Sequence, residues 1–187
     1  MHWVHATGFT AMLATGLILY LPALSELVAR RNLVKNVHLF SAFAWALAIV
    51  LVVVLGDRRR LAADWREIET LDADDRRWLR GRSVPQGRFN AGQKLNALLT
   101  ASFAVLFVVS GFFLWLGERD HLFLLDGAGT VHDTVMFVSV ALLAGHLYLA
   151  VIHPSTRHAL RGMTLGDVRE DWAREHHPKW VEDDPGI

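Results

Sequence analysis

Ten histidines and no cysteine decide which metal chemistry this chain can carry. Without thiols it can hold no disulfide, no iron–sulfur cluster and no thioether-linked c-type haem. Neutral imidazole, however, is a common ligand of redox metals. The histidines are therefore the candidate ligands. Six of them lie within or at the edge of a long apolar stretch: His2, His5, His38, His132, His146 and His153.

Four stretches of the chain are almost free of charge. Residues 3–23, 37–55 and 95–117 contain no Asp, Glu, Lys or Arg, and residues 131–153 contain only Asp133. Each is close to the roughly 20 residues with which a helix crosses a bilayer. An open sheet would leave unpaired backbone groups in lipid. The sequence therefore predicts an all-α fold, a transmembrane four-helix bundle forming one integral-membrane domain over residues 1–187, with the first stretch retained as a helix.

The basic residues predict the orientation of these helices. The connection 56–94 holds ten Lys or Arg and the tail 154–187 holds five, whereas the two short links hold four in total. By the positive-inside rule, the long loop, the tail and both termini are cytoplasmic. Apolar residues at roughly helical spacing in the loop favour short amphipathic helices on the membrane surface, although a solvated connector anchored by tryptophans explains them equally well. The net charge of zero gives no basic face for nucleic acid.

A histidine inside a membrane helix is costly unless it faces a partner, so each one is a functional hypothesis. His132 and His146 are 14 residues apart, which places them about 40° from the same face and about 21 Å apart along one helix. In the predicted topology His38 lies at the outer depth of His132. At the inner depth His146 has either His2 or His5, one helical turn apart, as its partner, and depth slightly favours His5.

Two facing pairs of histidines, one near each membrane surface, are the arrangement that holds two bis-histidine b-type haems. Such a pair of haems carries electrons across the bilayer. Glycines in the same helices would allow a porphyrin or a neighbouring helix to approach closely, and helix packing alone explains them equally well. They are Gly8, Gly16, Gly111 and Gly145.

Four segments resemble the cytochrome b (gamma) subunit of membrane-bound respiratory formate dehydrogenase. They are the opening MHWVHATGF with a following TG, the KNVH entry to the second helix, GRFNAGQKLN before the third, and the run from HLYLA through RGM to WAREHHPKW. The resemblance covers nearly the whole chain and implies a protein of the bacterial inner membrane. It implies haem ligation by His2, His38, His132 and His146, with His5 in reserve for His2. The departure from the family pattern is the missing polar lead-in before the first HW pair.

The resemblance also implies a site for menaquinone or ubiquinone beside the inner haem. The NAGQK stretch would form it with Asn90 and Gly92, together with His146, while Gln93 and Lys94 are weaker candidates. From the residues alone, a helix start at the membrane surface with Asn90 as its cap is the favoured explanation.

The function that these observations predict is an electron-transferring membrane anchor. Electrons would enter from an iron–sulfur (beta) subunit that works with a molybdopterin-type catalytic (alpha) subunit, and would leave to the quinone. No substrate-oxidising site is expected on this chain. One alternative is the cytochrome b subunit of a hydrogenase or a thiosulfate-reductase-type complex. An alternative of another class is a haem-free anchor or a metal transporter.

Overall fold

The computed structural model describes residues 1–183 and contains helices and no strand in that range. Four segments are long and apolar enough to cross a membrane. They are α1 (His2–Tyr20), α3 (Arg31–Leu55), α6 (Ala91–Gly117) and α7 (Ala128–Leu147), the last extended by the π-helical turn η2 (Tyr148–Ile152). The predicted all-α fold with four membrane-spanning helices is thereby confirmed for the described residues.

Shorter helices connect and follow the long ones. They are α2 (Pro22–Val28), α4 (Arg58–Glu69), α5 (Ala73–Trp78), the 3₁₀ turn η1 (His121–Phe123), α8 (Ala159–Thr164), α9 (Glu170–His176) and α10 (Pro178–Asp183). The long connection therefore carries two helices, α4 and α5. Asp72 begins α5 with a reciprocal capping box, in which its carboxylate accepts from the Asp75 N–H and the Asp75 carboxylate accepts from the Asp72 N–H.

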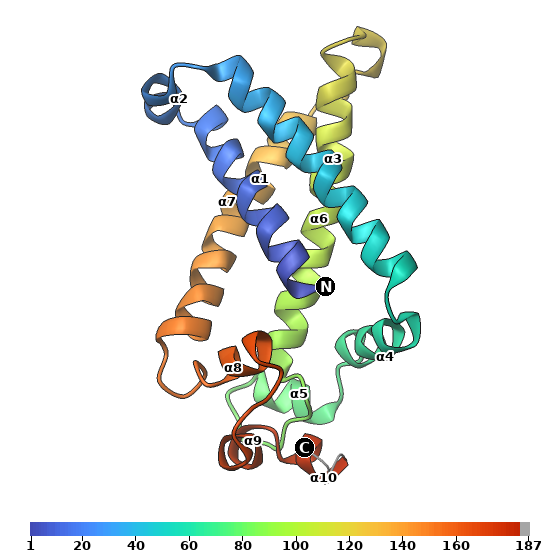
Figure 1. The fold of residues 1–187 in the computed structure, drawn as a ribbon, viewed down its shortest axis with the longest axis vertical. Coiled ribbons are helices and arrows are strands. Elements are labelled where there is room, and N and C mark those ends of the chain that lie inside the picture. Colours follow the sequence, from blue (N-terminus) through green and yellow to red (C-terminus); the bar gives the residue numbers. More distant parts are fainter. Residues whose placement is uncertain (184–187) are drawn as a thin grey trace. The chain divides into compact units, whose positions relative to one another are not determined.

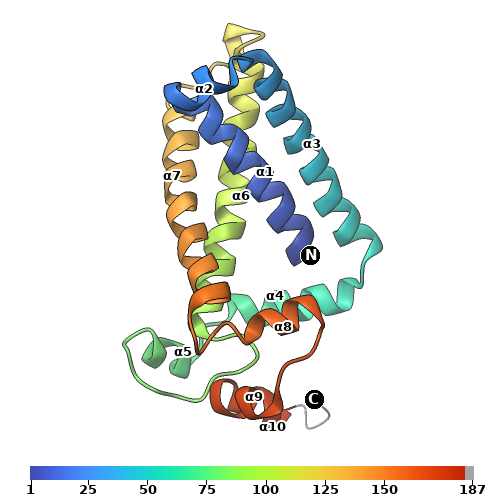
Figure 2. The same cartoon turned by 60° about the vertical axis from the view of Figure 1, so that its left-hand side comes forward.

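The chain forms two compact units. One comprises residues 1–63 and 104–140, and the other comprises residues 64–103 and 141–187. In the first unit α1 packs lengthwise against α3, as Figures 1 and 2 both show. Gly8 makes this close approach possible, because a Cβ atom there would lie 2.2 Å from Cδ1 of Trp45. The indole of Trp45 thus occupies the space that any other residue at position 8 would fill.

In the second unit, the start of α6 is tied to α5 by a buried ion pair. Lys94 Nζ lies 2.7 Å from Asp75 Oδ2 and also donates to the Thr70 carbonyl at 3.1 Å. Arg88 pairs with both Asp64 and Glu67, so the loop before α6 is fixed from a second side. These contacts give the segment that precedes α6 a defined conformation.

Most large apolar side chains on the long helices are exposed. Phe40, Leu55 and Val105 are 75%, 77% and 62% exposed, respectively. A water-soluble protein rarely leaves so much apolar surface open. Hydrocarbon is a favourable environment for the same side chains, and the helical hydrogen bonds satisfy the backbone without water. The exposed surface is therefore what a membrane-integral protein presents to lipid.

Candidate functional site

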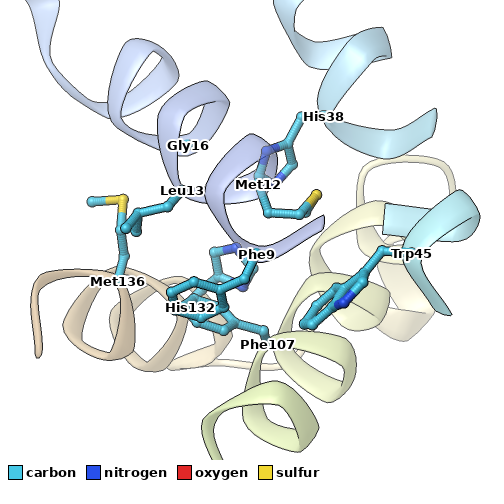
Figure 3. A pocket seen from close by; sticks show the side chains of 9 residues that line it. All are labelled: Phe9, Met12, Leu13, Gly16, His38, Trp45, Phe107, His132 and Met136. Atoms are coloured by element: carbon cyan, nitrogen blue, oxygen red, sulfur yellow. The ribbon is translucent and has the colours of Figure 1, made fainter. Parts of the chain in front are cut away.

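The structure brings together His38 of α3 and His132 of α7. Their ring centroids are 6.3 Å apart and their planes are inclined by 70°. Both rings are half-buried, and both line one cavity within the first unit (Figure 3). Two imidazoles from different helices thus face each other, as the sequence predicted for the outer pair.

Each of these histidines has a hydroxyl partner on a neighbouring helix. His38 Nδ1 lies 2.7 Å from Thr15 Oγ1 of α1, and His132 Nδ1 lies 2.9 Å from Ser110 Oγ of α6. Each hydroxyl also donates to the carbonyl four residues earlier, Thr15 to Ala11 at 2.8 Å and Ser110 to Leu106 at 2.6 Å. All four long helices therefore contribute to the histidine pair.

A glycine follows each hydroxyl and lies beside the same histidine ring. A Cβ atom at Gly16 would lie 3.6 Å from Cε1 of His38, and one at Gly111 would lie 3.3 Å from Cε1 of His132. Each ring therefore rests against a hydroxyl–glycine pair of the adjacent helix. The contact at Gly111 is tight, whereas that at Gly16 is an ordinary van der Waals distance, and close approach of a porphyrin to these glycines stays a prediction. A Cβ atom added at Gly145, by contrast, would meet no atom within 4 Å among the described residues.

The remaining walls of the cavity are apolar and aromatic. The residues that line it besides the histidines and Gly16 are Phe9, Met12, Leu13, Trp45, Phe107 and Met136. Phe107 packs edge-on against His132, with centroids 5.2 Å apart. Two imidazoles set in such a wall suit a flat, hydrophobic group that needs axial nitrogen ligands, and haem is such a group. The residues present therefore fit a bis-histidine haem.

The first helix carries two further histidines in different surroundings. His2 is exposed and packs edge-on against Trp3. His5 stacks on Phe9 and contacts Trp45, and its buried Nε2 has no hydrogen-bond partner within residues 1–183. His146, their predicted partner, is exposed in the other unit. The inner pair, formed by His146 with either His2 or His5, stays a prediction.

The NAGQK stretch begins α6 with a reciprocal cap. Asn90 Oδ1 accepts from the Gln93 N–H, and Gln93 Oε1 accepts from the Asn90 N–H, both at 2.9 Å. Gly92 lies against Trp78, since a Cβ atom at position 92 would be 3.1 Å from Cη2 of that indole. The capping role of Asn90 is thus realised, and its side-chain amide nitrogen is not used by the cap. Lys94 is committed to Asp75 and Thr70, as described above.

The HHPKW segment binds the loop that leads into NAGQK. His177 is buried and its Nδ1 lies 2.7 Å from the Gly87 carbonyl. The Lys179 N–H donates to the Gln86 carbonyl, and Gln86 Oε1 in turn accepts from the Ala91 N–H. Burial lowers the pKa of His177, which keeps the ring neutral. This segment therefore supports the start of α6.

Sequence reasoning missed Thr15 and Ser110. Hydroxyl residues are frequent in membrane helices, where they usually bond their own i−4 carbonyl. A usable signal was present, however, because Thr15–Gly16 and Ser110–Gly111 are the same kind of dipeptide on two different helices. Recognising this signal would have required knowing that both dipeptides face a histidine.

Comparison with known proteins identifies a family and several relatives to which the chain is similar. Residues 1–166 match the model of the family described as prokaryotic cytochrome b561. The cytochrome b556 subunit of formate dehydrogenase from Haemophilus influenzae is 22% identical over 98% of this chain and 79% of its own length. Two subunits of Escherichia coli K12 are similar over 97% of this chain. The nitrate-inducible cytochrome b556(Fdn) subunit is 21% identical over 86% of its length, and the cytochrome b556(fdo) subunit is 23% identical over 87%. The resemblance inferred from the sequence is confirmed.

Proposed function

This chain belongs to the prokaryotic cytochrome b561 family, and from that premise we propose that it is the dihaem membrane subunit of a respiratory formate dehydrogenase. Family membership and the four apolar helices make it a membrane-integral cytochrome b with b-type haem. The observation that supports the proposal most directly is the His38–His132 pair, which faces an apolar cavity from two long helices.

His38 and His132 would hold the outer haem, and His146 with His2 would hold the inner one, with His5 in reserve. When bound, haem iron supplies reversible one-electron transfer. Phe9, Phe107 and Met136 are among the apolar residues that line this cavity, and they would disfavour water beside a haem held there. The inner pair rests on the 14-residue spacing along α7 and on the family resemblance.

The quinone site would lie at the start of α6, where Gly92 is next to both the Asn90 side chain and the indole of Trp78. The amide nitrogen of Asn90 is a suitable donor to a quinone carbonyl, and the indole offers an aromatic surface to its ring. The positive-inside distribution favours a cytoplasmic location for this segment and both termini. Proton uptake there, combined with electron entry on the opposite side, would separate charge across the membrane.

The partners would be the iron–sulfur subunit and the molybdopterin-type catalytic subunit of the same complex. This chain has no cysteine with which to hold an iron–sulfur cluster itself. Purification in mild detergent, followed by identification of the co-purifying subunits, distinguishes a formate dehydrogenase from a hydrogenase or thiosulfate-reductase-type complex. Recovery of a hydrogenase large subunit would contradict the formate dehydrogenase assignment.

Haem counting tests the cofactor assignment. We expect about two b-type haems per purified chain by pyridine haemochromogen assay and a reduced α band in the visible spectrum.

His38→Ala and His132→Ala should each remove the outer haem, and His146→Ala should remove the inner one. His2→Ala and His5→Ala, measured side by side, identify the fourth ligand. Two haems remaining in His146→Ala would show that the pairing is wrong, and a haem-free wild-type protein would favour the anchor or transporter alternative.

A further inference from the structure

Thr15 and Ser110 occupy equivalent positions around the outer histidine pair. Each lies on a helix that neighbours a ligand-bearing helix, each is followed by glycine, and each places its hydroxyl oxygen within 2.9 Å of a histidine Nδ1. Thr15 contacts His38, and Ser110 contacts His132. The arrangement is thus the same on both sides of the cavity.

The hydroxyl hydrogens decide the direction of these bonds. A hydroxyl has one hydrogen to donate and two lone pairs to accept with. The Thr15 hydrogen is directed to the carbonyls of Ala11 at 2.8 Å and Met12 at 3.1 Å, and the Ser110 hydrogen to that of Leu106 at 2.6 Å. Because each hydrogen is committed to the helix backbone, the oxygen accepts from the ring. This pattern favours the tautomer in which each histidine carries its hydrogen on Nδ1 and donates it to the hydroxyl oxygen.

This tautomer leaves the Nε2 lone pair of each ring available for a metal. A ligating histidine generally donates its other N–H to an acceptor, which fixes the ring orientation and raises the basicity of the ligand. We infer that Thr15 and Ser110 are positioning residues that hold His38 and His132 in the Nδ1–H form and present both Nε2 atoms to the outer haem. The inference rests on the proposed function, because it presumes that this pair binds haem.

The hydroxyls should also influence the redox potential of that haem. A more basic imidazole stabilises the oxidised iron, so an Nδ1–H bond to an oxygen acceptor lowers the potential. Removing the acceptor should therefore raise it. Gly111 contributes on the His132 side, where an added Cβ atom would lie 3.3 Å from Cε1 of the ring, closer than most such contacts. A hydroxyl with only a packing role would not produce this shift.

The test compares variants that remove the hydroxyl with variants that keep it. Thr15→Val preserves the shape of the side chain, and Ser110→Ala removes only the oxygen. Thr15→Ser and Ser110→Thr retain the hydroxyl and should behave as wild type. Thr10→Val on α1 and Ser102→Ala on α6 are matched controls. Thr10 is exposed, and the hydroxyl of Ser102 bonds its own i−4 carbonyl, that of Leu98.

The measurement is an optical redox titration of the purified membrane subunit in its complex, with electron paramagnetic resonance of the oxidised haems. We expect Thr15→Val and Ser110→Ala each to raise the potential of one haem component by about 30 to 60 mV. This equals a three- to tenfold change in the ratio of oxidised to reduced haem at about 59 mV per tenfold. The resonance of that haem should shift, and the second component should stay unchanged.

Potentials identical to wild type in both hydroxyl-free variants, with haem retained, would overturn the inference. If Thr15→Val fails to retain the outer haem, Thr15→Ser must restore both the haem and the wild-type potential, and failure to do so would equally overturn it. The proposed function fails in a different way, namely through the persistence of both haems in His38→Ala and His132→Ala. The two outcomes can therefore be told apart.

Discussion

Gly8 and Trp45 form a very close contact between α1 and α3, and the indole of Trp45 is 6% exposed. Its Nε1 is buried and has no hydrogen-bond partner in the described part of the chain. The ring is therefore held by packing, and its neighbours His5 and Phe9 depend on its position.

Replacing Gly8 by alanine should destabilise the protein, because the new methyl group would lie 2.2 Å from Trp45 Cδ1. Overpacking of this kind costs about 1–3 kcal/mol. Gly129→Ala is the matched control, since its Cβ would approach Leu114 Cδ2 at 3.9 Å, an ordinary contact. The check is the thermal unfolding midpoint in detergent, which should fall for Gly8→Ala and stay level or rise for Gly129→Ala. Equal midpoints would show that Trp45 moves aside freely.

Asn90 combines a structural role with a proposed binding role, and two substitutions separate them. Asn90→Asp keeps the oxygen that accepts from the Gln93 N–H but removes the amide donor. Asn90→Ala removes both and should cost about 0.5–2 kcal/mol through loss of the cap. We expect both variants to lower quinone reduction while haem content is unchanged. Full turnover in Asn90→Asp would leave Asn90 with the capping role alone.

His177 should make the C-terminal segment sensitive to acid. Burial lowers its pKa from the ordinary value of 6.5, while the bond to the Gly87 carbonyl opposes this and the neighbouring His176 adds to it. Below pH 6.5 the unfolded segment takes up a proton that the folded one resists, so stability falls as the pH decreases from there. Limited proteolysis of the segment between about pH 8 and pH 5 should accelerate in acid.

The control for this pH dependence is His177→Asn, which keeps a side-chain N–H near the position of Nδ1 but does not titrate. We expect its proteolysis rate to change less with pH than that of the wild type. The same acceleration in both proteins would assign the effect to other groups.

At the scale of elements, the buried Lys94–Asp75 pair joins α6 to α5. Removing one partner of a buried pair leaves an uncompensated charge and costs about 3–5 kcal/mol. Lys94→Met should therefore lower the unfolding midpoint substantially. Arg174→Met is the comparison, because Arg174 and Glu170 form an exposed pair, each 64% exposed, whose contribution is about 0–1 kcal/mol. A loss of similar size in both variants would contradict a structural role specific to the buried pair.

The long helices could be predicted from the sequence because lipid imposes one simple requirement, about 20 apolar residues without charge. The predicted stretch 37–55 begins later than α3, which starts at Arg31, because Lys35 and Arg31 find partners beyond the apolar core. Lys35 pairs with Glu118, and Arg31 donates to the Leu19 carbonyl. Charge alone therefore marks the lipid-embedded part of a helix and misses its polar end.

The site was predictable only in part, for a related reason. The spacing of His132 and His146 on one helix can be read directly from the sequence, and the positive-inside rule then supplies His38 as the outer partner. The contributions of Thr15 and Ser110 depend on how α1 and α6 rotate about their own axes. Small side chains and close contacts, such as that of Gly8 with the indole of Trp45, set that rotation. It cannot be predicted from the spacing of apolar residues in the sequence.

At the scale of the whole molecule, the absence of cysteine makes the orientation directly measurable. A single cysteine at Leu122, which is 90% exposed between α6 and α7, should react with a membrane-impermeant maleimide in spheroplasts. A cysteine at Leu165, 70% exposed after α8, should react only after the membrane is opened. The unmodified chain is the blank for both. Labelling in the reverse order would invert the predicted topology.

The π-helical turn at the end of α7 has a consequence for how this helix tolerates change. In it the His153 N–H donates to the Tyr148 carbonyl five residues earlier, at 2.9 Å, so the turn accommodates more residues than a regular one. Directly after this turn the His153 ring packs edge-on against Tyr148, and its Nδ1 lies 3.0 Å from Ser155 Oγ. Because the wider turn takes up an extra residue at the end of the helix, the tail that follows can gain or lose a residue without changing the register of the earlier turns, which carry His132 and His146.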